Sequence, residues 1–184
     1  MRRAAAQYGE RMAVDDDLLA DGGPEKEFHP GIAARLARKT AAGGALIRDA
    51  HGRMLFVEPI YKSYLEIPGG VTEENESPLA TCRREVREEI GLSLLIGRLL
   101  VVDWIPVRDI WLDSLQFVFD GGVLDDDQIA AITLADDELR AFEFLTLDEA
   151  GPNLRPSMAR RLRAAVDAAA DGVTRYVEFG RLPE

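Results

Sequence analysis

The sequence has 184 residues, of which 47% are hydrophobic and 30% are charged, and its formal net charge is −11. Such values are typical of one soluble globular domain, and the acidic balance argues against a nucleic-acid polymer as partner, because its phosphates would be repelled. A single cysteine excludes an internal disulfide within these residues, and no run is long and apolar enough for a signal peptide or a membrane span. We therefore expect a cytoplasmic protein without a membrane partner.

Residues 1–37 are predicted to form an N-terminal extension to a domain that occupies residues 38–184. The extension mixes charges of both signs and contains an Asp-Gly-Gly-Pro break at residues 21–24. It shows no strong apolar periodicity, although Gly31–Lys39 is compatible with a short helix. We expect this segment to be flexible or to pack on a partner.

Strand patterns begin after Lys39. Two apolar runs flank Asp49-Ala50-His51-Gly52, which is typical of a hairpin turn that ends in glycine. The predicted strands are Thr40–Arg48, Arg53–Ile60, Tyr64–Ile67, Leu94–Ile105, Ser114–Leu124 and Ala141–Leu147. Val173–Phe179 is compatible with either a last strand or an ordered tail.

Two helices are predicted between these strands and after them. The first begins at Ser77, an N-cap followed by proline at the first helical position, and closes at Gly91. The second begins at Ser157 and ends before Gly172. Their apolar stripes are Leu79, Cys82, Val86 and Ile90 in the first and Met158, Leu162, Val166 and Ala169 in the second. A central and a closing helix among strands predict an α/β domain with helices on both faces of a mixed sheet.

Three carboxylates share one face of the first helix. Glu85, Glu88 and Glu89 are spaced i, i+3 and i+4, which places them side by side. Carboxylate oxygens held this close are suited to Mg²⁺, which binds through a few carboxylates, water and substrate phosphates. An ordinary solvated acidic face is the alternative for the helix alone. Cys82 lies on the buried stripe, so we interpret it as a core residue and not as a nucleophile.

The wider spacing around these carboxylates matches a known signature. The segment GVTEENESPLATCRREVREEIGL, residues 70–92, contains G, five residues, E, seven residues and then R-E-aliphatic-x-E-E-x-G-aliphatic. In this it resembles the Nudix hydrolases, at all nine specified positions. The resemblance covers roughly residues 38–170 and implies an α/β/α sandwich with a mixed β-sheet, which agrees with the element order. It also implies Mg²⁺ or Mn²⁺ as cofactor.

The resemblance implies a role for each acidic residue of the helix. Glu85 and Glu89 would be direct metal ligands, and Glu88 would be a third ligand, bridging or through water. Glu88 or a neighbour such as Glu89 would help to activate the nucleophile. The backbone carbonyl of Gly69 or Gly70 would complete the metal shell.

Other positions of the motif are implied to be structural. Gly70 begins the motif, Gly91 closes the helix, and Glu76 and Arg84 would pair with each other to hold the loop on the helix. Some relatives use a further acid from a loop after the motif as ligand or base. Glu138 lies in the corresponding region and is our candidate, with a merely solvated acidic loop as the alternative.

The implied reaction is hydrolysis of a nucleoside diphosphate linked to another moiety, and ADP-ribose or a sugar nucleotide is the favoured substrate. A nucleoside triphosphate pyrophosphohydrolase and a non-catalytic nucleotide sensor are the alternatives. Pro106 lies one residue short of a proline typical of ADP-ribose hydrolases, and it equally suits a strand end. Trp104 and Trp111 are candidates for binding a base, although core packing would explain them too. Family habit also suggests a homodimer.

Overall fold

The computed structural model describes residues 18, 20–23, 26–135 and 137–184. The chain divides into two units, Met1–Ala37 and Arg38–Glu184. In the first unit, helix α2 spans Ile32–Arg35 and ends where Leu36 adopts an extended conformation. The expected helix at Gly31–Lys39 is therefore only four residues long. Within the described residues, no helix is long and apolar enough to cross a membrane.

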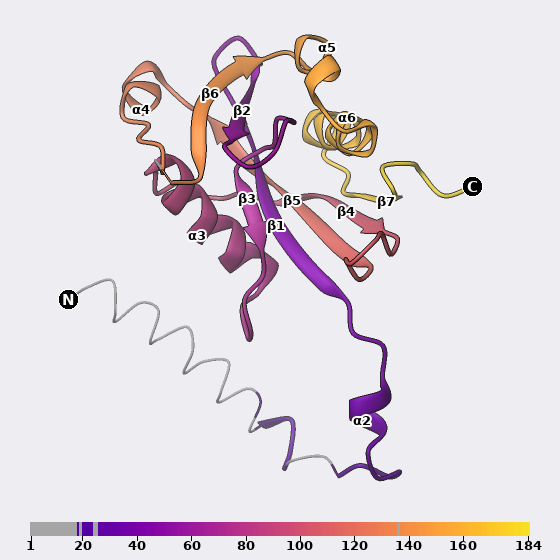
Figure 1. Ribbon diagram of the computed structural model, residues 1–184. Helices are drawn as coiled ribbons and strands as arrows, with labels where there is room; N and C mark the ends of the chain where they lie inside the picture. The colour runs from indigo at the N-terminus through magenta and orange to yellow at the C-terminus, as the bar shows by residue number, and fades with distance from the viewer. Residues whose placement is uncertain (1–17, 19, 24–25, 136) are drawn as a thin grey trace, which may run out of the picture. The chain divides into compact units, whose positions relative to one another are not determined.

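The second unit is built on a seven-stranded mixed sheet (Figure 1). Its strands are β1 Thr40–Arg48, β2 Met54–Pro59, β3 Gly69–Val71, β4 Leu99–Ile105, β5 Ser114–Val123, β6 Leu139–Leu145 and β7 Arg175–Glu178. The order is β6-β2-β1-β5-β4-β7, and β3 pairs with β1 outside this path. The β1–β5 and β4–β7 pairs are parallel and the other pairs are antiparallel. The predicted α/β fold with a mixed sheet is confirmed.

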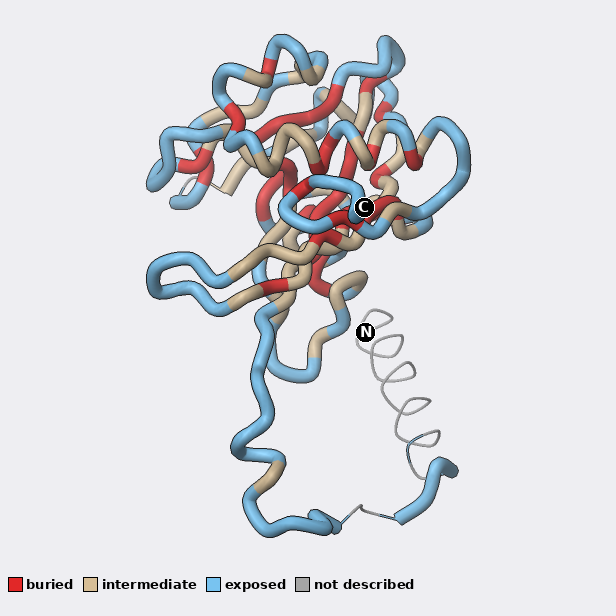
Figure 2. Tube along the Cα trace, turned by 90° about the vertical axis from the view of Figure 1, so that its right-hand side faces the viewer, coloured by how far each residue is buried: buried red, intermediate tan, exposed pale blue. Residues whose placement is uncertain are grey.

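Two helices cover opposite faces of this sheet: α3, Pro78–Ile90, and α6, Pro156–Asp171 (Figure 1). Ile47 of β1 packs in the cluster that includes the apolar face of α3, whereas the preceding residue, Leu46, packs in the cluster that includes α6. Consecutive strand residues point to opposite faces, so β1 contributes to both cores. Buried residues accordingly follow the strands and the inner faces of the helices (Figure 2).

Helix α3 has the ends that its sequence predicts. The Ser77 hydroxyl accepts a hydrogen bond from the backbone N–H of Ala80 at 3.2 Å, and Pro78 is the first helical residue. Gly91 closes the helix at φ 73°, a left-handed conformation that glycine adopts without strain. Cys82 is fully buried, and burial raises the pKa of its thiol to about 12, as suits a core residue.

The strand expected at Tyr64–Ile67 is wrong. Only Glu66 makes a bridge there, with Val57, and the strand that leads to α3 is instead β3. Pro68 interrupts the apolar run, because it has no N–H for a sheet hydrogen bond. The two glycines after it can approach β1 closely, which apolar patterning does not reveal.

Several element boundaries also differ from expectation. β4 begins only at Leu99, after Gly97 and Arg98 interrupt the long predicted run. Helix α6 begins at Pro156, so Ser157 lies inside the helix and does not cap it. Val173–Phe179 contains a true strand, β7, which decides between the two alternatives left open for that segment.

Two short helices were not predicted, although each carries a recognisable start signal. α4, Asp126–Ala130, begins with a reciprocal capping box between Asp125 and Gln128. α5, Leu147–Ala150, begins with the same arrangement between Thr146 and Glu149 and is followed by a 3₁₀ turn at Gly151–Asn153. The second box also explains why β6 ends at Leu145 and not at the expected Leu147.

Candidate functional site

The candidate site begins where β3 passes between β1 and α3. A Cβ atom on Gly70 would lie 2.2 Å from Oε1 of Glu85, and one on Gly69 would lie 2.5 Å from the Cα of Gly44. Real Cβ atoms do not make contacts this short, so Gly69, which meets backbone atoms and has φ 154°, requires glycine, whereas a side chain at position 70 would displace the Glu85 carboxylate. The two glycines therefore let the strand lie directly against the acidic face of α3.

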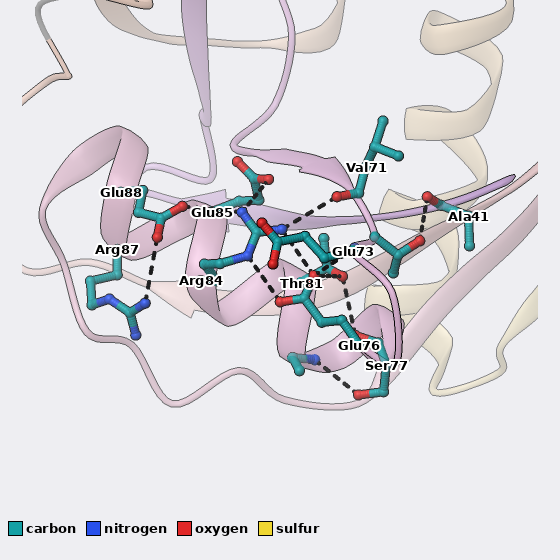
Figure 3. A network of polar contacts seen from close by, with 12 residues as sticks. Ala41, Val71, Glu73, Glu76, Ser77, Thr81, Arg84, Glu85, Arg87 and Glu88 are labelled. Carbon is teal, nitrogen blue, oxygen red and sulfur yellow. Dashed lines mark hydrogen bonds and ion pairs between the residues drawn. The ribbon is translucent and has the colours of Figure 1, made fainter. Parts of the chain in front are cut away.

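A charged fork joins the loop after β3 to α3 (Figure 3). Arg84 donates from Nε to Oε1 of Glu76 and from Nη2 to Oε2 of Glu76, each at 2.9 Å. The Thr81 hydroxyl donates to the same Glu76 Oε2 at 2.8 Å. The hydrogen bonds from Arg84 are the main cause that lowers the pKa of Glu76 to about 2. This carboxylate is thus committed to holding the loop on the helix.

The same arginine also contacts two of the predicted metal ligands. Its Nη1 lies 2.7 Å from Oε1 of Glu85 and 3.1 Å from Oε2 of Glu88 (Figure 3). Glu85 is largely shielded from solvent, and this burial raises its pKa, partly offset by Arg84. Glu88 is more open, with half of its side chain exposed. Arg84 therefore orders the carboxylates that lie beside it.

Glu89 is the buried carboxyl of the site. Its Oε2 accepts a hydrogen bond from the backbone N–H of Gly69 at 2.8 Å, and only 9% of the residue is exposed. Burial is the main cause that raises its pKa to about 8, and the charges of Glu85 and Glu138 add to the rise. Glu138 itself is exposed and lies in the turn immediately before β6. Glu85, Glu89 and Glu138 therefore lie close enough together for their charges to interact.

The donor set fits a divalent cation, although the carboxylates turn toward other partners in the structure. Among the described residues, no group of three Asp, Glu, His or Cys side chains is arranged to hold an ion. The charges of Glu85 and Glu138 nevertheless raise the pKa of Glu89. Those of Glu88 and Glu138 raise the pKa of Glu85, and a bound cation would relieve this repulsion. The Gly69 N–H, and not its carbonyl, is the group that faces Glu89.

A cavity of about 210 Å³ opens beside Glu89. Its walls come from β1, β3 and β5, from the loop after β2 and from α6. Lys62 lines this cavity with Glu66, and its Nζ lies 3.3 Å from Oε1 of Glu66. The charge of Lys62 also acts to lower the pKa of Glu89. Lys62 was not predicted as a site residue, although it is the only cation between Arg53 and Arg83 in the sequence.

The two candidate tryptophans lie away from this cavity. The indole N–H of Trp104 donates to Oδ2 of Asp113 at 3.1 Å, and Trp111 is 67% exposed in the loop between β4 and β5. Neither residue lines the cavity, whereas Phe117 does. Base binding by Trp104 or Trp111 therefore stays a prediction that the cavity does not support.

The NUDIX domain model matches residues 37–167. The MutT-like protein of Streptomyces ambofaciens is 30% identical over 129 residues, which cover 70% of this chain and 77% of that protein. The Methanol dehydrogenase activator of Bacillus methanolicus is 32% identical over 84 residues, or 44% of this chain and 42% of that protein, so less than half of this relative is matched. The crystal structure of a UDP-X diphosphatase shares the fold, with a TM-score of 0.64 over 94% of this chain and 85% of that one at 18% identity.

Proposed function

The chain belongs to the NUDIX domain family, whose model matches residues 37–167, and from this we propose how its site acts on nucleoside diphosphate derivatives. As a member it is a Nudix hydrolase, a pyrophosphohydrolase of nucleotide-type substrates. We assign the reaction to the unit Arg38–Glu184, which contains all the site residues. The observation that carries the proposal is the buried Glu89, which lines the cavity together with Gly69 and Lys62.

The acidic face of α3 would hold the divalent metal, Mg²⁺ or Mn²⁺. When bound, such an ion neutralises charge on phosphoryl oxygens and lowers the pKa of water. Glu85, Glu88 and Glu89 are the residues that would hold it, with the backbone of Gly69 or Gly70 beside them. Arg84 orients Glu85 and Glu88 through its Nη1 contacts.

Proton transfer from water would fall to a carboxylate of this cluster. In the metal-free protein burial raises the pKa of Glu89 to about 8, and a bound cation would lower it, so that Glu89 would be ionised and able to accept a proton. Glu88 and Glu138 are more exposed and are the other two candidates for this role. Lys62 lines the same cavity and offers a positive charge to a phosphate oxygen. The four side chains thus provide a proton acceptor and an anion contact around one reacting diphosphate.

The substrate that we favour is a nucleoside diphosphate linked to a sugar, with ADP-ribose or another sugar nucleotide ahead of a nucleoside triphosphate. The cavity volume of about 210 Å³ is below the range of about 300–1,000 Å³ for sites that enclose a drug-sized ligand, so one part of a nucleotide fits inside and the rest extends outward. Lys62 is the one cation at the Glu89 end among the residues that line the cavity. A single cation beside a metal suits a diphosphate better than a free triphosphate tail.

Product analysis tests this choice of substrate. With Mg²⁺ present, we expect ADP-ribose to yield AMP and ribose 5-phosphate, and a sugar nucleotide to yield a nucleoside monophosphate and a sugar phosphate. Chromatography of the products with phosphorus NMR identifies the bond that is cleaved. Rapid release of pyrophosphate from a dNTP, with no cleavage of any sugar nucleotide, would refute the choice.

We also propose a homodimer, supported by the apolar loop between β4 and β5. Ile110 and Trp111 are 87% and 67% exposed there, and such a protruding apolar group is typical of a protein contact. Light scattering at micromolar concentration should give about twice the chain mass of 20.3 kDa. A mass near that of one chain would reject the dimer.

A further inference from the structure

A buried ion pair fixes one side chain at the α6 end of the cavity. Arg161 of α6 is 7% exposed, and its Nε donates to Oδ2 of the fully buried Asp103 of β4 at 2.8 Å. The other oxygen of Asp103 accepts a hydrogen bond from the backbone N–H of Gly180 at 3.0 Å. A buried carboxylate with both oxygens satisfied holds the guanidinium in one orientation.

Part of this guanidinium faces the cavity. Its Nη1 lies 3.6 Å from the sulfur of Met158, a weak acceptor, and no hydrogen bond of Nη2 is found among the described residues. Within the described part of the chain, the buried side-chain nitrogen or oxygen atom without a partner is Nε of Arg48 alone. The Nη2 group of Arg161 is therefore accessible and not enclosed by protein, and the cavity is the space that Arg161 lines.

An acceptor lies next to this donor. Gln116 of β5 is the cross-strand partner of Asp103, and such partners project from the same face of a sheet. Gln116 also lines the cavity, and its Nε2 donates to the Ser114 hydroxyl at 3.0 Å. Among the described residues, no donor contacts its Oε1. The α6 end of the cavity thus presents a guanidinium donor and an amide acceptor side by side.

The remaining walls at this end are apolar. Ile67 and Val118 are 7% and 2% exposed, and both belong to the core cluster on the α6 face of the sheet. With Met158, they line the cavity around Gln116 and Arg161. Apolar walls with a few polar groups at one edge are what a planar nucleobase requires. A phosphate is less suited, because Asp103 already balances the charge of Arg161.

We propose that this end of the cavity binds the nucleobase, and that Arg161 and Gln116 select uracil or guanine over adenine or cytosine. Uracil and guanine both present a carbonyl acceptor next to a ring N–H donor, which complements a guanidinium donor next to an amide acceptor. Adenine and cytosine, when anchored by the same ribose and diphosphate, carry an amino donor in place of that carbonyl and an unprotonated ring nitrogen in place of the N–H, so donor would meet donor and acceptor would meet acceptor. This selectivity rests on the proposed function, in which the diphosphate lies at the Glu89 end. It narrows the substrates proposed above, so that UDP- or GDP-linked sugars come ahead of ADP-ribose and other ADP-linked ones.

Binding of the four nucleoside 5′-monophosphates tests the proposal without relying on turnover. Isothermal titration calorimetry of UMP, GMP, AMP and CMP with Mg²⁺ should give a Kd about tenfold lower for UMP and GMP, as expected for one paired set of base contacts. Comparison of UMP with GMP then shows which of the two bases the cavity accepts better. A difference of less than twofold between the two groups would overturn the proposal.

Two variants assign the preference to the proposed residues. Arg161→Lys keeps a positive charge for Asp103 but loses the planar Nη groups, and Gln116→Leu removes the acceptor with little change in size. Each should bring the base preference close to one by weakening UMP and GMP binding. Arg163→Lys, an exposed change two residues along the same helix, should leave the preference unchanged. Retention of the preference in both Arg161→Lys and Gln116→Leu would overturn the assignment, and Gln116→Leu decides alone if the arginine variant does not fold.

Turnover of ADP-glucose, CDP-glucose, GDP-glucose and UDP-glucose tests the proposed reaction and the base preference separately, because only the base differs among these four substrates. Preferential binding of UMP or GMP without cleavage of any of the four sugars would contradict the proposed reaction and leave the base preference standing. Equal cleavage of all four would support the reaction and overturn the base preference.

Discussion

Glu89→Gln is expected to lower kcat about a thousandfold, which corresponds to roughly 4 kcal/mol of activation free energy. The substitution removes a negative charge from the proposed metal ligands and removes the group that can accept a proton near neutral pH. Packing should hardly change, because a glutamine oxygen can still accept the hydrogen bond from the Gly69 N–H. Steady-state kinetics on the best sugar nucleotide and a thermal melt of the same sample measure both effects.

Glu74→Gln is the matched control for this variant. Glu74 lies in the same motif but is exposed and occupies none of its specified positions, so its turnover should equal that of the wild type. A wild-type rate for Glu89→Gln would contradict the role given to this residue. So would a rate lost only because the variant no longer folds.

In protein freed of metal by a chelator, the melting temperature of Glu89→Gln relative to the wild type should depend on pH. The folded-state pKa of Glu89 is about 8 and its ordinary value is 4.5, so between these pH values the folded state holds a proton that the unfolded state has lost. The contribution of Glu89 to the free energy of unfolding is therefore fully present below pH 4.5 and is lost as pH rises to about 8. Glutamine does not titrate, so the melting temperature of Glu89→Gln should gain on the wild type across this range. A constant difference would contradict the buried, protonated state.

Arg84→Ala should destabilise the protein by about 2–3 kcal/mol, less than for a fully buried ion pair because one fifth of the arginine side chain is exposed. The loss leaves Glu76, Glu85 and Glu88 without their shared partner. We expect a fall of about 4–12 °C in melting temperature for a chain of this size. The rate should fall only about tenfold, since the carboxylates remain but are less well oriented.

Arg83→Ala is the control for this stability effect. Arg83 is the preceding residue of the same helix and is exposed, so its removal should change the free energy of unfolding by less than about 0.5 kcal/mol. Equal destabilisation by the two alanine variants would show that the ion pair between Arg84 and Glu76 does not stabilise the fold. A stable Arg84→Ala protein without activity would instead make Arg84 a catalytic residue.

Helix α3 could be predicted from the sequence because its signals are local. Ser77, Pro78 and Gly91 define its ends, and a spacing of three and four residues places Glu85, Glu88 and Glu89 on one face. The same reasoning fails for the strand before it. Whether Tyr64–Ile67 or β3 pairs with β1 depends on how closely two backbones can approach, and that approach is decided by glycines in both strands.

The opposite end of the cavity could not be predicted at all. Arg161 and Asp103 are 58 residues apart, and Gln116 meets them only through the register of β4 and β5. In the sequence, Asp103 is a lone acid in an apolar run and Arg161 is one of several arginines in an amphipathic helix. Only the fold shows that the pair is buried and that Arg161 lines the cavity.

The central claim is that the acidic face of α3 holds the divalent metal. Its most direct test is a titration with Mn²⁺ in which electron paramagnetic resonance measures the free ion. Wild-type protein and Glu74→Gln should deplete the free Mn²⁺ signal equally, and added Mg²⁺ should restore it by competition. Glu89→Gln should bind Mn²⁺ about 10–100-fold more weakly. Equal Mn²⁺ affinity in the wild type and Glu89→Gln would contradict the account.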